Sequence, residues 1–185
     1  DKLFKFNFEF NNILNHTYFV KDVSGIVLPV QEFNNLGVFK MNISKKISFN
    51  KFAIDNRVQF QKTGDESLGI INIPELILRN TFYYQVELFK KALFLQTGFT
   101  FNYFSEFYMN SYDPLLSEFY VQNNKLIGNF PRIDFFVNAK IQQTRIFLKA
   151  EHINSSFTGY NYYSAPNYPY RDFSIRFGLV WNFFM

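Results

Sequence analysis

The chain of 185 residues has no cysteine, only two histidines and no long apolar run. Without cysteine it forms no disulfide, no thiolate metal site and no thiol nucleophile. No apolar stretch reaches the ~18 uninterrupted residues expected of a transmembrane helix. The net charge of +4 is scattered along the chain, so nucleic acid is not an expected partner.

Residues that carry catalytic or metal chemistry are equally scarce. His16 and His152 lie far apart, and neither has metal-ligand spacing. We expect His152 to be a polar residue at the rim of the fold rather than part of a hydrolase site. The sequence has no glycine-rich phosphate loop, nucleophile elbow or paired carboxylates. It therefore predicts no catalytic residue, no metal site, no cofactor and no enzymatic activity.

Aromatic residues, in contrast, are abundant. The chain has 27 Phe and 12 Tyr, and aromatics make up 22% of it, yet the mean hydropathy is only −0.13. A soluble core does not need so many rings. A membrane-spanning β-barrel does, because it coats a lipid-facing band and both interfaces with aromatic side chains while its other face stays polar.

The segment 171–185 has the clearest pattern in the chain. Successive side chains of a strand point to opposite faces. Large apolar residues occupy every second position: Phe173, Ile175, Phe177, Leu179, Trp181 and Phe183. Such a strand would turn one face to lipid and the other to water.

The same segment resembles the C-terminal signal by which outer-membrane barrels are recognised for assembly. The residues that carry this resemblance are Arg176, Gly178, Trp181 and Phe183. That signal usually closes on a terminal aromatic, whereas here Met185 follows Phe184. The resemblance implies that the barrel-assembly machinery is a partner.

Alternation with a period of two recurs along the chain, and a period of 3.6 does not. It predicts about nine strands, near residues 4–10, 15–23, 39–47, 52–61, 81–88, 93–103, 133–141, 145–151 and 171–185. The second has only weak alternation, and Asn56 falls unexplained on the apolar side of the fourth. We therefore predict an all-β fold over 1–185, a transmembrane, antiparallel, up-and-down β-barrel of the outer-membrane type.

The connections between the predicted strands alternate in length. Tight links are predicted near 10–14, 49–51, 89–91 and 142–144, and long ones at 24–35, 63–75, 105–131 and 154–170. Barrels of this class have short periplasmic turns and long extracellular loops. We therefore expect a periplasmic C-terminus, with every tight turn on the same side.

The strand count gives a further expectation. Bacterial single-chain barrels normally have an even number of strands. Nine strands would make the first one run toward the tight-turn side, so at least one more strand would have to precede it. We expect the chain to be the C-terminal part of a larger barrel. The alternative is a complete eight-stranded barrel in which the weak second strand is miscounted.

A transport function would depend on the inward polar face. The pore-lining candidates are Lys40, Arg57, Gln59, Arg79, Glu87, Asp134, Lys140, Arg145, Lys149, Glu151 and Arg176. Together with Lys5, Lys46, Glu9 and Asp55, which share this face, these residues give nine basic against five acidic side chains. Because rings of charge set selectivity in pores, this excess favours a mild anion preference. The alternative is that the charges pair across neighbouring strands. Phe136 and Phe147 also point inward and would fill part of the interior.

The segment from Phe130 onward resembles the C-terminal end of the family described as putative porins of Bacteroidota outer membranes. The resemblance is strongest over the last third of the chain. It rests on P-R-I-D-F-F-V-N at 131–138, R-I-F-L-K-A-E-H at 145–152, Y-S-A-P-N-Y-P at 163–169 and the motif at 171–181. It implies a long single-chain barrel in the outer membrane of a Gram-negative bacterium. It carries over no catalytic residue.

Two functions are compatible with such a barrel. One is a porin that lets small hydrophilic solutes diffuse passively. The other is a non-conducting structural subunit of a larger outer-membrane transport or secretion complex. Both would contact outer-membrane lipid, and the second would bind another outer-membrane protein. The sequence does not separate the two.

Overall fold

The computed structural model describes residues 4–157 and 162–183. Within these residues the chain forms one large antiparallel sheet of eight strands in the order β1-β4-β5-β6-β7-β12-β13-β16. The strands are β1 (Phe4–Ile13), β4 (Leu36–Phe49), β5 (Phe52–Thr63), β6 (Leu76–Leu88), β7 (Leu93–Phe104), β12 (Arg132–Ile141), β13 (Thr144–Glu151) and β16 (Ser174–Trp181). This confirms the predicted all-β, antiparallel architecture.

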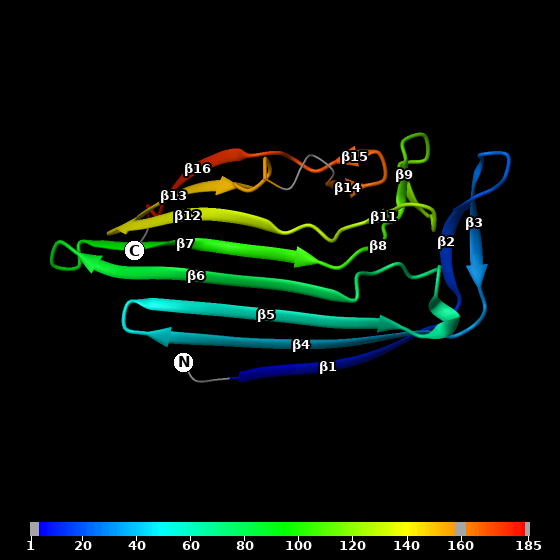
Figure 1. The fold of residues 1–185 in the computed structure, drawn as a ribbon, viewed down its shortest axis with the longest axis horizontal. Coiled ribbons are helices and arrows are strands. Elements are labelled where there is room, and N and C mark those ends of the chain that lie inside the picture. The colour runs from blue at the N-terminus through cyan, green and yellow to red at the C-terminus, as the bar shows by residue number, and fades with distance from the viewer. Residues whose placement is uncertain (1–3, 158–161, 184–185) are drawn as a thin grey trace.

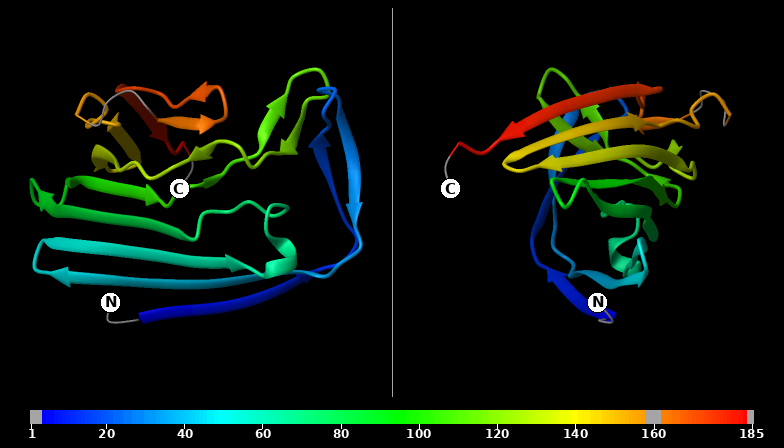
Figure 2. Two further views of the ribbon diagram at one scale, coloured as in Figure 1. Left: turned by 45° about the vertical axis from the view of Figure 1, so that its right-hand side comes forward. Right: turned by 90° about the vertical axis from the view of Figure 1, so that its left-hand side faces the viewer.

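The sheet is open in the described part of the chain. Figure 2 shows that it is curved, with β1 and β16 at its two ends, and each of these strands pairs on one side only. The closed barrel expected from the sequence is therefore absent from these residues. The unpaired sides of β1 and β16 present backbone N–H and C=O groups that further strands could pair with.

The strand count corrects the sequence prediction. The weak segment 15–23 does form a strand, β2 (His16–Lys21), but β2 pairs outside the large sheet. The link near 10–14 is not a tight turn, because β1 continues to Ile13 and β2 follows it. β1 consequently runs away from the tight-turn end, opposite to the direction expected. With eight strands in the sheet, the odd-number argument for an additional preceding strand no longer applies.

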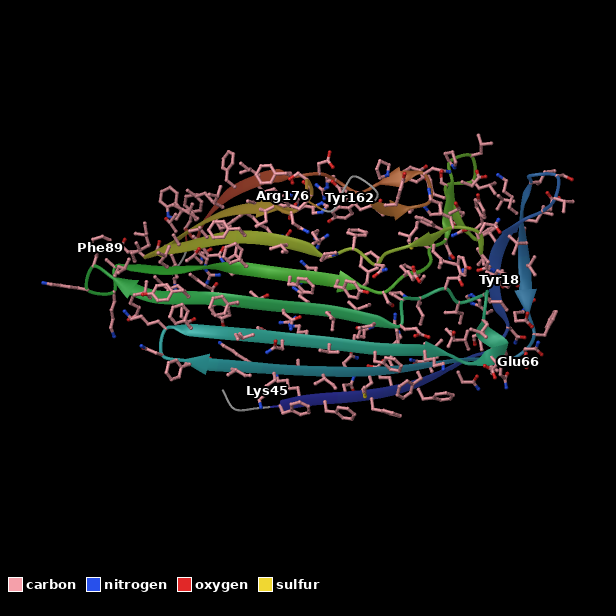
Figure 3. The ribbon with its side chains drawn as sticks, viewed as in Figure 1. Tyr18, Lys45, Glu66, Phe89, Tyr162 and Arg176 are labelled. Atoms are coloured by element: carbon pink, nitrogen blue, oxygen red, sulfur yellow. The ribbon has the colours of Figure 1, made fainter. Side chains whose placement is uncertain are left out.

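Connection lengths follow the predicted alternation elsewhere. The tight turns β4–β5, β6–β7 and β12–β13 gather at one end of the sheet, together with the start of β1 and the end of β16, and the long connections gather at the other (Figure 1). Asn50 and Gln142 adopt left-handed backbone with φ of 53° and 51°, which lets these two links reverse the chain within two residues. Figure 3 places Phe89 at the tight-turn end, and Tyr18 and Glu66 at the opposite end.

The long connections build structure of their own. A four-stranded sheet has the order β3-β2-β10-β9 and is made of β2, β3 (Val27–Glu32), β9 (Ser111–Asp113) and β10 (Glu118–Val121). Two further sheets have two strands each: β8 (Phe107–Tyr108) with β11 (Leu126–Ile127), and β14 (Tyr163–Ala165) with β15 (Tyr168–Pro169). β10 lies parallel to β2, so segments distant in sequence meet in the four-stranded sheet. A short 3-10 turn, η1 (Asp65–Ser67), packs at the start of β4, where the Ser67 hydroxyl donates to the Gly37 carbonyl.

The large sheet has opposite chemistry on its two faces. One face carries large apolar side chains that are exposed: Phe4, Phe6, Phe8 and Phe10 on β1, and Ile175, Phe177, Leu179 and Trp181 on β16. Phe177 is 84% exposed. In a protein surrounded by water such residues would be inside. An apolar surface of this extent is typical of a face that meets a non-aqueous environment or another protein.

The exception at Asn56 has a structural explanation. Lys45, Asn56 and Asn80 lie side by side on β4, β5 and β6, on the otherwise apolar face. The Asn56 amide donates to the Lys45 carbonyl, and the Asn80 amide donates to Asn56 Oδ1 at 2.8 Å. The three residues form a short polar row that satisfies the two amides across the strands.

Candidate functional site

The register of the large sheet places every predicted pore-lining residue on its polar face. Ser44 of β4 is opposite Arg57 of β5, which is opposite Arg79 of β6. The same parity runs through β7, β12, β13 and β16, where Lys149 is opposite Arg176. The residues that share this face are Lys40, Arg57, Gln59, Arg79, Glu87, Asp134, Lys140, Arg145, Lys149, Glu151 and Arg176.

The polar face is hollowed. One hollow of about 420 Å³ spans β5 to β13, from Arg57 and Arg79 to Asn138 and Lys149. A second of about 570 Å³ spans β1 to β6 and includes Lys5 and Lys46. Both contain Asp55, Arg57 and Arg79, so the two hollows form one trough, which we call the polar trough.

At the β12–β13–β16 side of the trough, charges of opposite sign alternate. Asp134 is 2% exposed and lies 3.7 Å from Arg132 Nε and 3.2 Å from Lys149 Nζ. Lys149 Nζ also lies 2.8 Å from Glu151 Oε1, and Arg176 Nε lies 3.0 Å from Glu151 Oε2. These five residues form a continuous ion-pair chain across three strands. The charges here pair across neighbouring strands, which is one of the two outcomes that the sequence allowed.

At the β5–β6 side, like charges face each other. Arg57 and Arg79 are directly opposite each other. Among the residues described, the only acid within ion-pair distance of either is Asp55, whose Oδ1 lies 3.4 Å from Arg57 Nε. Lys140 and Arg145 form a second like-charge pair next to the β12–β13 turn. Of the remaining candidates, Glu87 pairs with Lys91 at 3.8 Å and Gln59 donates to Gln61 at 2.8 Å.

Sequence reasoning missed Arg132 as a member of the polar face. Arg132 joins the ion-pair chain, and one of its guanidinium nitrogens donates to the Tyr170 hydroxyl. Asn102 lies opposite both Arg79 and Arg132, and its amide donates to Asp134 at 3.4 Å. Arg132 had a usable signal, because it precedes Asp134 by two positions and so shares its face.

Two glycines of the polar face lie opposite aromatic residues of neighbouring strands. Phe147 lies opposite Gly178, and a Cβ at Gly178 would come within 2.4 Å of its ring. Gly98 lies opposite both Tyr83 and Phe136, and a Cβ there would meet the Phe82 carbonyl oxygen at 2.1 Å. Phe136 and Phe147 therefore share the polar face, as expected, and occupy part of the trough.

The residues of the predicted assembly signal divide between the two faces. Trp181 lies on the apolar face, 56% exposed, and its ring stacks with that of Phe183 at 4.7 Å. Arg176 and Gly178 lie on the polar face, in the ion-pair chain and under Phe147 respectively. Phe184 and Met185, which follow the motif, lie outside the described residues.

His152 is not the rim residue that the sequence suggested, because it is completely buried. Its ring contacts those of Phe130, Tyr162 and Tyr170. Nδ1 lies 2.9 Å from the Arg171 carbonyl oxygen, which can only accept, so Nδ1 carries a proton. Nε2 has no hydrogen-bond partner among the described residues. Together with the His152 backbone N–H, which donates to Asp134, this arrangement fixes the connection after β13 against β12.

No group of three or more His, Cys, Asp or Glu side chains in the described residues could hold a metal ion. No helix there is long and apolar enough to cross a membrane.

The described residues thus form an antiparallel sheet that is apolar and exposed on one face, and charged and hollowed on the other. The model of the family described as putative porins matches residues 1–185, the whole chain. The chain belongs to this family. No curated protein and no solved structure gives a significant match. The match covers the whole chain and not only the last third, where the sequence motifs resemble the family most strongly.

Proposed function

We propose that the chain forms part of the wall of an outer-membrane β-barrel porin, through which small hydrophilic solutes diffuse passively. The observation that carries this proposal is the separation of the two faces of the large sheet. Exposed rings on one face suit lipid, and the polar trough on the other suits water. Membership of a porin family supports the same assignment. The outer membrane would be that of a Gram-negative bacterium, with the tight-turn end and the C-terminus in the periplasm.

We also propose that further strands pair with the free sides of β1 and β16 and complete the wall. A barrel of about eight strands is largely filled by its own side chains, whereas about sixteen leave an aqueous channel. The polar face here carries mostly long charged and amide side chains, which a narrow interior would have to pack. A wider barrel leaves them hydrated.

The test of this function is conductance. The intact protein, purified and reconstituted in planar bilayers, should give ohmic single-channel steps in KCl. It should also fractionate with outer membranes and give a strand-dominated circular dichroism spectrum. A protein that is inserted and folded yet shows no conductance contradicts the pore.

One observation favours a second candidate function, a structural subunit of a larger outer-membrane complex. The polar row of Lys45, Asn56 and Asn80 lies on the face that would otherwise meet lipid, where a charged side chain at mid-depth costs about 2–4 kcal/mol. A protein neighbour would shield this row. Absence of conductance, together with copurification in a fixed ratio with another outer-membrane protein, would favour this function over the pore.

Assembly of the barrel provides a further prediction. We propose that Gly178, Trp181 and Phe183 are recognised by the barrel-assembly machinery. A charged residue in place of Phe183, near the edge of the bilayer, should cost less than the ~2–4 kcal/mol expected at mid-depth. The level of folded Phe183→Lys protein in the membrane should nevertheless fall further than this stability loss explains. Levels equal to wild type would contradict recognition.

A further inference from the structure

One row of the polar trough has cations at four of its six positions. Reading across the strands, Lys5 is opposite Ser44, Ser44 is opposite Arg57, and Arg57 is opposite Arg79. The row continues through Asn102 to Arg132. It contains no acidic side chain over six neighbouring strands. Like charges placed directly opposite each other destabilise a sheet, so this row favours the binding of an anion that would offset the repulsion.

Within this row, Arg57 and Arg79 are the pair available to a ligand. The Arg57 side chain is 64% exposed, and its one ion pair uses Nε and leaves the two terminal nitrogens without a partner in the described chain. Arg79 is also exposed and has no ion-pair or hydrogen-bond partner among the described residues. Arg132, by contrast, is held by Asp134 and Tyr170.

The surroundings of the pair suit a small anion. Both hollows of the polar trough meet at Arg57 and Arg79, so space lies on either side of the pair. Ser44 and Asn102 occupy the next positions in the row and add neutral hydrogen-bond donors. The planar fork of arginine matches the two oxygens of a carboxylate or a phosphate group.

We propose that Arg57 and Arg79 form a binding site for the carboxylate or phosphate group of a solute in the polar trough. This proposal rests on the proposed function, since it makes the pair the point at which anionic solutes are selected during passage. Lys5 and Arg132 contribute positive potential from the same row without contacting the anion. Lys140 and Arg145, near the tight turn, lie outside this row and outside both hollows.

The site can be tested in planar bilayers with the intact protein. Inorganic phosphate or a dicarboxylate, added to one side, should reduce the chloride current with saturation. In Arg57→Gln/Arg79→Gln, the half-effective concentration should rise about tenfold or more, as expected for loss of a charge-assisted hydrogen bond. Which of the two anions acts at the lower concentration identifies the preferred group.

Two further variants separate a specific site from a general charge effect. Lys140→Gln/Arg145→Gln removes the same charge from the same face and should change the half-effective concentration by less than about twofold. Arg57→Lys/Arg79→Lys keeps the charge but not the fork, so it should retain the chloride selectivity and still weaken the anion effect. If the anion reduces the chloride current at the same half-effective concentration in wild type and in Arg57→Gln/Arg79→Gln, the proposed site is wrong.

Failure of the pore and failure of the site are distinguishable. If the wild-type protein does not conduct, titration calorimetry with phosphate and with the dicarboxylate on folded protein in detergent still tests the pair. Saturable heat in wild type that is lost in Arg57→Gln/Arg79→Gln supports the site in a non-conducting barrel. Absence of heat from wild type with both anions overturns it. Strand-dominated circular dichroism spectra confirm that each variant is folded.

Discussion

The two sides of the polar trough carry similar side chains in opposite arrangements. At the β12–β13–β16 side, Lys149 is also opposite a cation, Arg176, but Asp134 and Glu151 lie within ion-pair distance, so that each of Arg132, Lys149 and Arg176 has an acidic partner. At the β5–β6 side, the register places Arg57 against Arg79. The difference shows that composition alone does not decide what a charged face does, because the cross-strand neighbours determine which charges remain available.

The two arrangements also differ in burial. Asp134 is nearly inaccessible, whereas the Arg57 and Asp55 side chains are 64% and 33% exposed. Ion pairs in water contribute little, and pairs that involve a buried charge become costly when one member is removed. We therefore expect the β12–β13–β16 side to contribute stability and the β5–β6 side to contribute ligand binding.

The largest effect should come from Asp134→Asn. This change leaves Lys149 and Arg132 with a weaker partner, and weakens the acceptor for the His152 backbone N–H at 2.9 Å. We expect a loss of about 2–3 kcal/mol in the free energy of unfolding, measured in urea on folded protein in detergent or lipid.

The matched control is Asp55→Asn on the β5–β6 side, where Asp55 has one exposed ion-pair partner among the described residues. It should cost less than about 1 kcal/mol. Similar losses for Asp55→Asn and Asp134→Asn would show that the two sides do not differ as argued.

A smaller effect should distinguish the two glycines. An added Cβ at Gly98 meets the Phe82 carbonyl and the Tyr83 backbone, which cannot move without disturbing the β6–β7 ladder. At Gly178 the three nearest atoms all belong to the Phe147 ring, a side chain, which can shift more easily than backbone. We expect Gly98→Ala to cost about 1–3 kcal/mol and Gly178→Ala less than about 1 kcal/mol in urea unfolding. A larger loss at Gly178 would contradict this order.

Much of the sheet could be predicted from the sequence because its signal is local. Alternation along one strand assigns each side chain to a face, and the lengths of the connections assign each end of the sheet. This is why residues as distant as Lys40 and Arg176 were correctly placed on one face. The pattern of Phe173 to Phe183 needed no knowledge of the neighbouring strands.

Non-local features could not be predicted in this way. The strand over 15–23 is real, but alternation does not indicate that it pairs with β3 and, in parallel, with β10. That pairing removes it from the large sheet and reverses the direction of β1. The ion pairs of Asp134 depend on the register between strands, which is set by the turns and the overall packing. The burial of His152 depends on rings contributed by Phe130, Tyr162 and Tyr170 from other segments.

The smallest effect concerns the polar row on the apolar face. Asn56→Leu removes the acceptor of the Asn80 amide and should cost about 1 kcal/mol in urea unfolding, because Asn80 then lacks its partner among the described residues. Asn56→Leu/Asn80→Leu replaces both partners with apolar groups and should recover most of this loss or exceed wild-type stability in a lipid bilayer. Each variant is compared with Val58→Leu, which lies on the same face and makes no side-chain hydrogen bond. A double variant less stable than Asn56→Leu would show that the face does not meet lipid at this row, and would favour a protein neighbour there.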